Sequence, residues 1–124
     1  MAIDYGKKRV GIASTDDTGL FALPREVWVN DADLLAKIIE FKTKEAIEAI
    51  IIGESKNLKG QANSIQTEIE ELKNTLEAKG IRVIYHPEVF TTVEARRLQG
   101  ETGLIDASAA ALILKSFLES VYNK

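Results

Sequence analysis

The 124-residue sequence contains no cysteine, only two prolines and no long hydrophobic run. Without cysteine the chain forms no disulfide and has no thiolate, which is typical of a reducing compartment and predicts a cytoplasmic protein. Because no apolar stretch approaches the roughly 20 residues of a transmembrane helix, we expect no membrane contact. An excess of positive charge is also missing, since the formal net charge is −3. Nucleic-acid binding would therefore depend on a local basic patch.

The remaining composition is that of one ordinary globular domain. Hydrophobic residues make up 45% of the chain and charged residues 28%. A chain of this length is large enough to bury one core but not two. Because no repeat, linker or low-complexity segment interrupts it, we expect a single domain over residues 1–124.

The first third of the chain predicts three antiparallel strands. Two short apolar runs, residues 1–3 and 10–13, flank a basic turn that contains glycine, and this pattern is typical of a β-hairpin. A third strand is expected over residues 20–29. It contains Pro24, which cannot donate to a sheet ladder and is found on edge strands.

The rest of the chain alternates helix and strand signals. A helix with acids in its first turn is predicted to start at residues 30–33, and longer helices over 61–79 and 105–122. Strands are predicted over 49–52 and 81–85. Since crossover connections are right-handed, both strands should run parallel to the first. The fold class is therefore α/β, with a five-stranded mixed sheet and helices on both faces.

Polar residues follow the parallel strands where each strand ends. Asp4 closes the first strand, Gly53 and Glu54 close the fourth, and Pro87 and Glu88 follow the fifth. Ligands of α/β proteins bind outside the carboxyl ends of the strands. We therefore predict a functional site at this edge of the sheet.

Asp4 is followed at once by three cations, Lys7, Lys8 and Arg9. A carboxylate beside cations can hold a divalent metal against a phosphate group, because Mg²⁺ prefers oxygen ligands. An ordinary polar strand end is the alternative. The residues alone leave both interpretations open.

Four ordered motifs cover nearly the whole chain. They are residues 4–13 (Asp-Tyr-Gly-Lys-Lys-Arg-Val-Gly-Ile-Ala), Gly53 with Asn57 and Gly60, residues 86–95 (His-Pro-Glu-Val-Phe-Thr-Thr-Val-Glu-Ala), and residues 105–114, which begin Ile-Asp-Ala. Each is weak alone, but the ordered set resembles the YqgF family of RuvC-like Holliday junction resolvases and pre-16S rRNA nucleases. The resemblance implies an RNase H-like fold whose central first strand has an acid at the active site.

The resemblance also implies a function. It predicts a Mg²⁺- or Mn²⁺-dependent endonuclease that acts on structured nucleic acid, either precursor rRNA or branched DNA. Asp4, Glu88 and Asp106 match the acidic positions of the family and are the predicted catalytic and metal-binding residues. The alternatives are an exposed loop acid for Glu88 and a helix cap for Asp106. Glu54 is a further candidate by position only.

Substrate phosphates would be bound by cations around the same edge of the sheet, which contact the backbone without reading sequence. These candidates are Lys7, Lys8, Arg9, Lys56, Lys59, Arg96 and Arg97. Solvated surface cations are the alternative, and Arg96 and Arg97 cannot both point the same way on a helix. For His86, a structural role at the strand end is preferred to proton transfer.

The chain also departs from the family pattern. Pro87 stands where aspartate is common, Val89 where arginine is common, and Glu54 and Ser55 where Leu-Pro is common. The segment 98–105 is shorter than usual and has no basic residue. The metal-binding acids are kept better than the cations, which predicts weak or altered activity.

Two other functions fit parts of the pattern. A non-catalytic nucleic-acid-binding or ribosome-assembly module would keep the fold and lose cleavage. Nucleotide phosphate binding at the hairpin, as in sugar kinases and actin-like proteins, needs two lobes, and the chain is too short for them. The sequence does not decide between RNA and DNA or give the oligomeric state.

Overall fold

A five-stranded sheet organises the computed structural model, which describes residues 1–54, 64–87 and 104–122. The elements in chain order are β1 (Ala2–Tyr5), β2 (Arg9–Thr15), β3 (Ala22–Val29), α1 (Leu34–Lys44), β4 (Ala49–Glu54), α2 (Ser64–Ala78), β5 (Arg82–Pro87) and α4 (Leu104–Tyr122). No helix within these ranges is long and apolar enough to cross a membrane.

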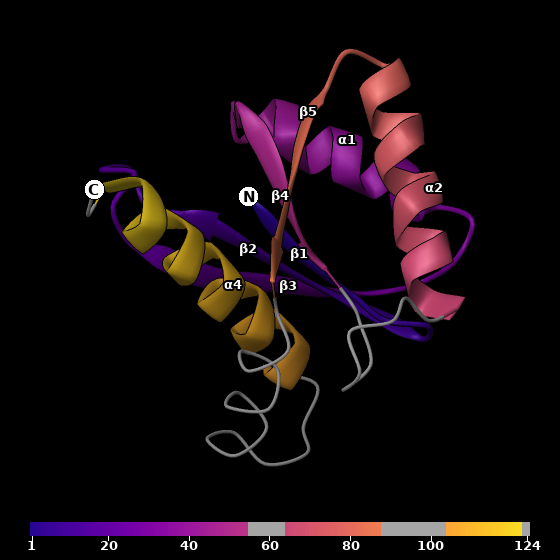
Figure 1. Ribbon diagram of the computed structural model, residues 1–124, viewed down its shortest axis with the longest axis horizontal. Helices are drawn as coiled ribbons and strands as arrows, with labels where there is room; N and C mark the ends of the chain where they lie inside the picture. Colours follow the sequence, from indigo (N-terminus) through magenta and orange to yellow (C-terminus); the bar gives the residue numbers. More distant parts are fainter. Residues whose placement is uncertain (55–63, 88–103, 123–124) are drawn as a thin grey trace.

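The strand order is β3-β2-β1-β4-β5, so β1 lies at the centre of the sheet (Figure 1). β2 runs antiparallel to both β1 and β3, whereas β1, β4 and β5 run parallel to one another. The predicted mixed sheet is confirmed, and so is the position of Asp4 on a central strand. The chain reaches β4 and β5 through the helices α1 and α2. Such crossover connections are what parallel neighbouring strands require, whereas antiparallel neighbours can be joined by a short turn.

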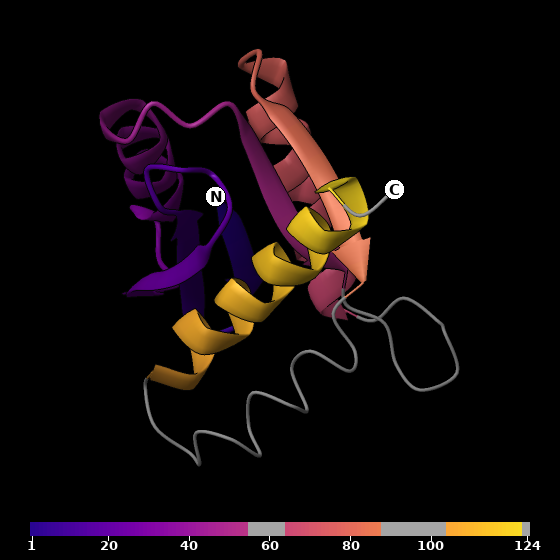
Figure 2. The same ribbon diagram turned by 90° about the vertical axis from the view of Figure 1, so that its left-hand side faces the viewer.

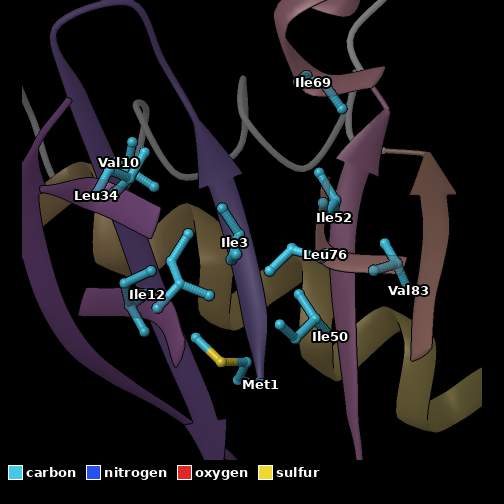
Figure 3. Packing of buried hydrophobic residues seen from close by; sticks show 11 residues of the cluster. Met1, Ile3, Val10, Ile12, Leu34, Ile50, Ile52, Ile69, Leu76 and Val83 are labelled. Atoms are coloured by element: carbon cyan, nitrogen blue, oxygen red, sulfur yellow. The ribbon is translucent and has the colours of Figure 1, made fainter. Parts of the chain in front are cut away.

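Helices cover the two faces of the sheet unequally: α1 and α2 lie on one face and α4 crosses the other (Figures 1 and 2). The alternation of side chains along β1 assigns its residues to these faces. Ile3 belongs to the core under α1 and α2, together with Ile38, Ile52 and Ile69. Figure 3 shows Ile3 and Ile52 side by side in this cluster.

The opposite core, under α4, is built largely from small residues. Ala2 of β1 and Ala13 of β2 pack there with Ala110, Ile113 and Leu114 of α4. Alanine on both surfaces lets the helix backbone come close to the central strands. The position of α4 over the sheet is therefore fixed by short side chains that leave little room for movement.

Local details agree with most of the predicted pattern. Pro24 lies on the edge strand β3, and the β2–β3 register shifts beside its partner, between Ile12 and Ala13. Helix α2 buries Ile69 and Leu76, and Gly80 follows its end with φ of 81°. A positive φ there costs glycine little and stops the helix.

One helix start differs from the prediction. Helix α1 begins at Leu34, later than expected, and no acid lies in its first turn. Asp33 occupies the N-cap position without a side-chain capping bond, while its backbone N–H donates to Asp31 Oδ1 at 3.0 Å. The acids thus shape the preceding turn, since aspartate readily accepts from a backbone N–H two residues on.

Candidate functional site

Asp4 lies near the carboxyl end of the central strand, half-buried, on the face that α4 covers. Ala2, two residues earlier, packs under α4, and side chains two apart on a strand share a face. In β2 the residue opposite Asp4 is Gly11. In β4, Ile52 lies beside Ile3, so one residue further along both strands Gly53 lies beside Asp4.

The two neighbouring glycines shape the surroundings of the Asp4 carboxylate. Gly11 and Gly53 are both buried, and neither has a side chain to fill the face at this level of the sheet. A Cβ at either position would project on the same side as Asp4, because directly paired residues share a face. These two neighbouring positions therefore add no side chain of their own on the Asp4 side of the sheet.

His86 of β5 continues the same row across the sheet, since it pairs with Gly53. Its Nε2 lies 2.8 Å from Ser116 Oγ, and its ring stands perpendicular to that of Phe117, with 6.1 Å between the centroids. Both partners belong to α4. Burial lowers the pKa of His86, which favours the neutral ring. These contacts agree with the structural role preferred for this histidine.

The start of α4 lies at the edge where β1, β4 and β5 end (Figures 1 and 2). Ala110 packs with Ala2 in the core under α4. From this contact, the path along β1 to Asp4 and the path back along α4 to Asp106 both lead toward that edge. Asp106 falls in the first turn of α4, one helical turn before Ala110.

The other predicted acids are described less fully. Glu54 ends β4 next to Gly53, and Glu88 lies outside the described residues. Within the described part of the chain, no group of three His, Cys, Asp or Glu side chains could hold a metal ion. The predicted cluster of Asp4, Glu88 and Asp106 therefore stays a prediction. The structure describes the backbone positions of two of its members, Asp4 and Asp106.

The three cations after Asp4 form the tip of the β1–β2 hairpin. Lys7, Lys8 and Arg9 are all exposed. The turn is tight, because a Cβ on Gly6 would lie 2.6 Å from the carbonyl oxygen of Arg9, closer than real Cβ atoms come. Glycine at this position lets the chain turn back directly behind Asp4, so that the cations extend from the same edge.

One residue that holds this hairpin was not predicted. Asn30, directly after β3, donates from Nδ2 to the Gly6 carbonyl at 2.7 Å and from its backbone N–H to the Lys8 carbonyl at 2.9 Å. A turn-forming residue at the end of the third strand was the only sequence signal. The other predicted cations, Lys56, Lys59, Arg96 and Arg97, lie outside the described residues.

A cavity of about 680 Å³ opens at the opposite edge of the sheet, near the starts of β1 and β4. Its cation, Arg25, is 2.7 Å from Glu45 and donates to Ser14 Oγ at 2.8 Å. Asp16, Asp17 and Glu48 also line the cavity. With its single arginine already paired to a carboxylate, this edge is acidic and does not suit a polyanion.

Comparison with known proteins gives consistent matches over nearly the whole chain. The sequence profile of a family described as RuvX, Holliday junction resolvase, matches residues 1–120. A Syntrophus aciditrophicus protein named "Putative pre-16S rRNA nuclease" is 33% identical over 98% of this chain and 88% of its own length. A protein of the same name from Bacteroides thetaiotaomicron is 36% identical over 97% of this chain and 95% of its own length.

Solved structures share the fold at low sequence identity. Thermus thermophilus RuvC in complex with a Holliday junction substrate has a TM-score of 0.59 and 16% identity, covering 96% of this chain and 92% of that protein. Fowlpox virus resolvase, in complex with Holliday junction DNA, has a TM-score of 0.58 and 14% identity, covering 97% and 96%. These similarities confirm the predicted RNase H-like fold.

Proposed function

The chain belongs to the RuvX family of Holliday junction resolvases, and from this premise we propose that it is a metal-dependent endonuclease that cuts structured nucleic acid. The family and the nuclease class were both predicted from the four sequence motifs, and both agree with the relatives. The residues that cleave, the metal and the substrate belong to the proposal. We place them in a single domain over residues 1–124.

The position of Asp4 carries the proposal. This carboxylate lies on the central strand, between two glycines and beneath α4, at the edge where the parallel strands end. The first turn of α4, with Asp106, begins at the same edge. Glu88 directly follows β5, another of the strands that end there. We therefore assign Asp4, Glu88 and Asp106 as the catalytic, metal-binding residues.

Three carboxylates are suited to Mg²⁺ or Mn²⁺, which prefer hard oxygen ligands. Gly11 and Gly53, in the strands on either side of Asp4, have no side chain that would exclude such an ion. Bound there, the metal would supply an activated water and charge stabilisation for the leaving oxygen of the phosphodiester. Asp4 would orient the site because its strand is hydrogen-bonded on both sides, and α4 would limit access of water from one face.

The substrate side of the proposal rests on the hairpin tip. Lys7, Lys8 and Arg9 are exposed next to Asp4 and can contact backbone phosphates without reading base sequence. Relatives are named for precursor 16S rRNA, and structural neighbours bind Holliday junctions. Both are folded polyanions, so we propose precursor rRNA or branched DNA as substrate, in the cytoplasm. Lys56, Lys59, Arg96 and Arg97 would extend the contact.

A non-catalytic binding module is the second candidate. Pro87 and Val89 replace an acid and an arginine that are common in the family, on either side of Glu88. A chain altered in this way could bind structured nucleic acid and cut it poorly. Binding and cleavage therefore have to be measured separately.

The test combines two substrates with a matched pair of variants. The protein is incubated with a precursor 16S rRNA fragment and with a four-way DNA junction, in Mg²⁺, Mn²⁺ or EDTA. We expect metal-dependent cleavage that falls at least about 100-fold in Asp4→Asn, because tenfold is lost for about every 1.4 kcal/mol of transition-state stabilisation. Asp17→Asn, an exposed acid at the opposite edge, should cut normally. Binding without cleavage would support the second candidate. If the protein neither binds nor cuts these substrates, both candidates are contradicted.

A further inference from the structure

Asn30 hydrogen-bonds to the backbone of the cationic hairpin tip, and we propose that it is a positioning residue for substrate binding. In this role it fixes the backbone of the tip, so that Lys7 and Lys8 meet backbone phosphates at a set distance from Asp4. The inference rests on the proposed function, because it concerns the same nucleic-acid substrate. It adds an uncharged residue, remote in sequence, to the phosphate-binding machinery.

The two hydrogen bonds of Asn30 bracket the two lysines of the tip. Asn30 directly follows Val29, which pairs with Arg9 at the end of the β2–β3 ladder. Its backbone N–H donates to the Lys8 carbonyl at 2.9 Å, and its side-chain Nδ2 donates to the Gly6 carbonyl at 2.7 Å. They belong to the peptide units before Lys7 and after Lys8, so a single residue fixes the backbone at both ends of this pair of lysines.

The tip needs such a clamp because the sheet ladder stops short of it. The β1–β2 register ends where Tyr5 pairs with Val10. Lys7 and Lys8 are exposed, so their side chains gain little from packing against the protein. A loose tip would lose conformational entropy each time it bound a phosphate backbone, which lowers affinity. A tip that is already ordered avoids that cost.

The clamp is also connected to the helical layer. The Asn30 side chain lies close enough to the Tyr5 hydroxyl to oppose the rise that burial causes in the Tyr5 pKa, and this hydroxyl donates to Glu68 Oε1 of α2 at 3.4 Å. Tyr5 is the last residue of β1 and directly follows Asp4. The tip is therefore tied to the strand that supplies the central acid and to a helix on the opposite face. This linkage sets the tip relative to Asp4.

The inference is tested with a double-mutant cycle of Asn30→Ala and Lys7→Ala. Affinity for a four-way DNA junction and for a precursor 16S rRNA fragment is measured by fluorescence anisotropy in EDTA, over a range of salt concentrations. Asn30→Ala removes the side-chain bond to Gly6 but keeps the backbone bond to Lys8. Asn74→Ala, the same substitution at an exposed position of α2, is the matched control.

We expect Asn30→Ala to weaken binding about fivefold, the usual value of one hydrogen bond. It should also flatten the salt dependence although asparagine has no charge, because a phosphate contact made by Lys7 is lost. In the Asn30→Ala background, Lys7→Ala should then reduce the affinity for nucleic acid by a smaller factor than it does in the wild type, since both changes remove the same contact. Asn74→Ala should change neither the affinity for nucleic acid nor the factor by which Lys7→Ala lowers that affinity.

Strictly additive effects with an unchanged salt slope would show that Asn30 only stabilises the fold, and would overturn the inference while the nuclease proposal stands. A wild-type protein that binds neither substrate would overturn the proposed function and the inference with it. If Asn30→Ala does not fold, Tyr5→Phe replaces it in the cycle. It cuts the link to Glu68, should weaken binding about twofold, and must show the same coupling to Lys7→Ala.

Discussion

At the scale of single residues, the site depends as much on missing side chains as on charged ones. Asp4 is bordered by glycine in both neighbouring strands, and a third glycine, Gly6, lets the chain turn immediately behind it. A Cβ on Gly6 would meet the Arg9 carbonyl oxygen and push the hairpin apart, while Gly11 and Gly53 add no side chain in the strands beside the carboxylate. The acid and the cations can then lie at one edge.

Gly6→Ala tests the tight turn. The new Cβ would lie 2.6 Å from the Arg9 carbonyl oxygen, which is backbone and cannot rotate away. We expect the free energy of unfolding to fall by about 1–3 kcal/mol, the usual cost of overpacking. Nucleic-acid affinity should fall as well, because the tip has to shift.

The matched control for this substitution is Gly19→Ala, in the β2–β3 turn. A Cβ there meets nothing within 4 Å, and its cost comes from the positive φ of 75° alone. Urea unfolding and anisotropy are measured for both variants. If Gly19→Ala weakened nucleic-acid binding as much as Gly6→Ala does, the effect would be global destabilisation and unrelated to the tip.

At the scale of elements, the packing of α4 on the sheet determines how near the first turn of this helix lies to the central strand. Its buried stripe is made of alanines where it crosses the sheet, at Ala107, Ala109 and Ala110. Small residues set a short distance between helix and sheet. This distance controls how Asp106, one turn before Ala110, lies relative to Asp4.

Ala110→Leu should lift α4 from the sheet. Ala110 is fully buried against Ala2 and Ala13, so three added carbon atoms have no space. We expect a loss of about 1–3 kcal/mol in stability and a larger fall in cleavage than in substrate affinity, because the hairpin tip is not displaced. Ala36→Leu, on the exposed side of α1, should stay within about 0.5 kcal/mol of the wild type. Equal losses of affinity and cleavage would contradict this role of α4.

Most elements could be predicted because their signals are local. The stripe of Ile69 and Leu76 in α2 and the edge position of Pro24 follow from periodicity and from the missing proline N–H. The start of α1 was predicted wrongly, since the acids before it stabilise a turn and not the helix. Turn and cap signals use the same residue types, so the sequence alone did not separate them.

The parts of the site that were missed depend on long-range pairing. Gly53 lies beside Asp4 only through the register of β1 and β4, strands about fifty residues apart in the chain. The contact of Asn30 with Gly6 depends in the same way on where β3 ends relative to the hairpin. Residue patterns identified Asp4, Lys7 and Lys8 as candidates, but no local pattern specifies which side chains stand next to them.

At the scale of the whole molecule, charge differs between the two edges of the sheet. The edge with Asp4 presents three exposed cations on the hairpin tip. The opposite edge has a cavity in which carboxylates outnumber a single, paired arginine. A protein with net charge −3 can therefore still present exposed cations at one edge of the sheet and a carboxylate-rich cavity at the other.

Metal binding links the proposed site to the stability of the whole chain. An ion that binds only the folded protein stabilises it by mass action, by about 2.7 kcal/mol at a concentration 100-fold above Kd. For a domain of this size, that corresponds to a rise in Tm of several degrees.

We expect Mn²⁺ to raise the Tm of the wild type in this way and to leave the Tm of Asp4→Asn unchanged, because the substitution removes the ligand at the centre of the site. Asp17→Asn, at the opposite edge, should keep the full rise. Thermal unfolding of the three proteins, each with Mn²⁺ and with EDTA, measures these increments. An Asp4→Asn protein that is less stable in EDTA and still gains the full Mn²⁺ increment would show that Asp4 supports the fold and does not bind the metal.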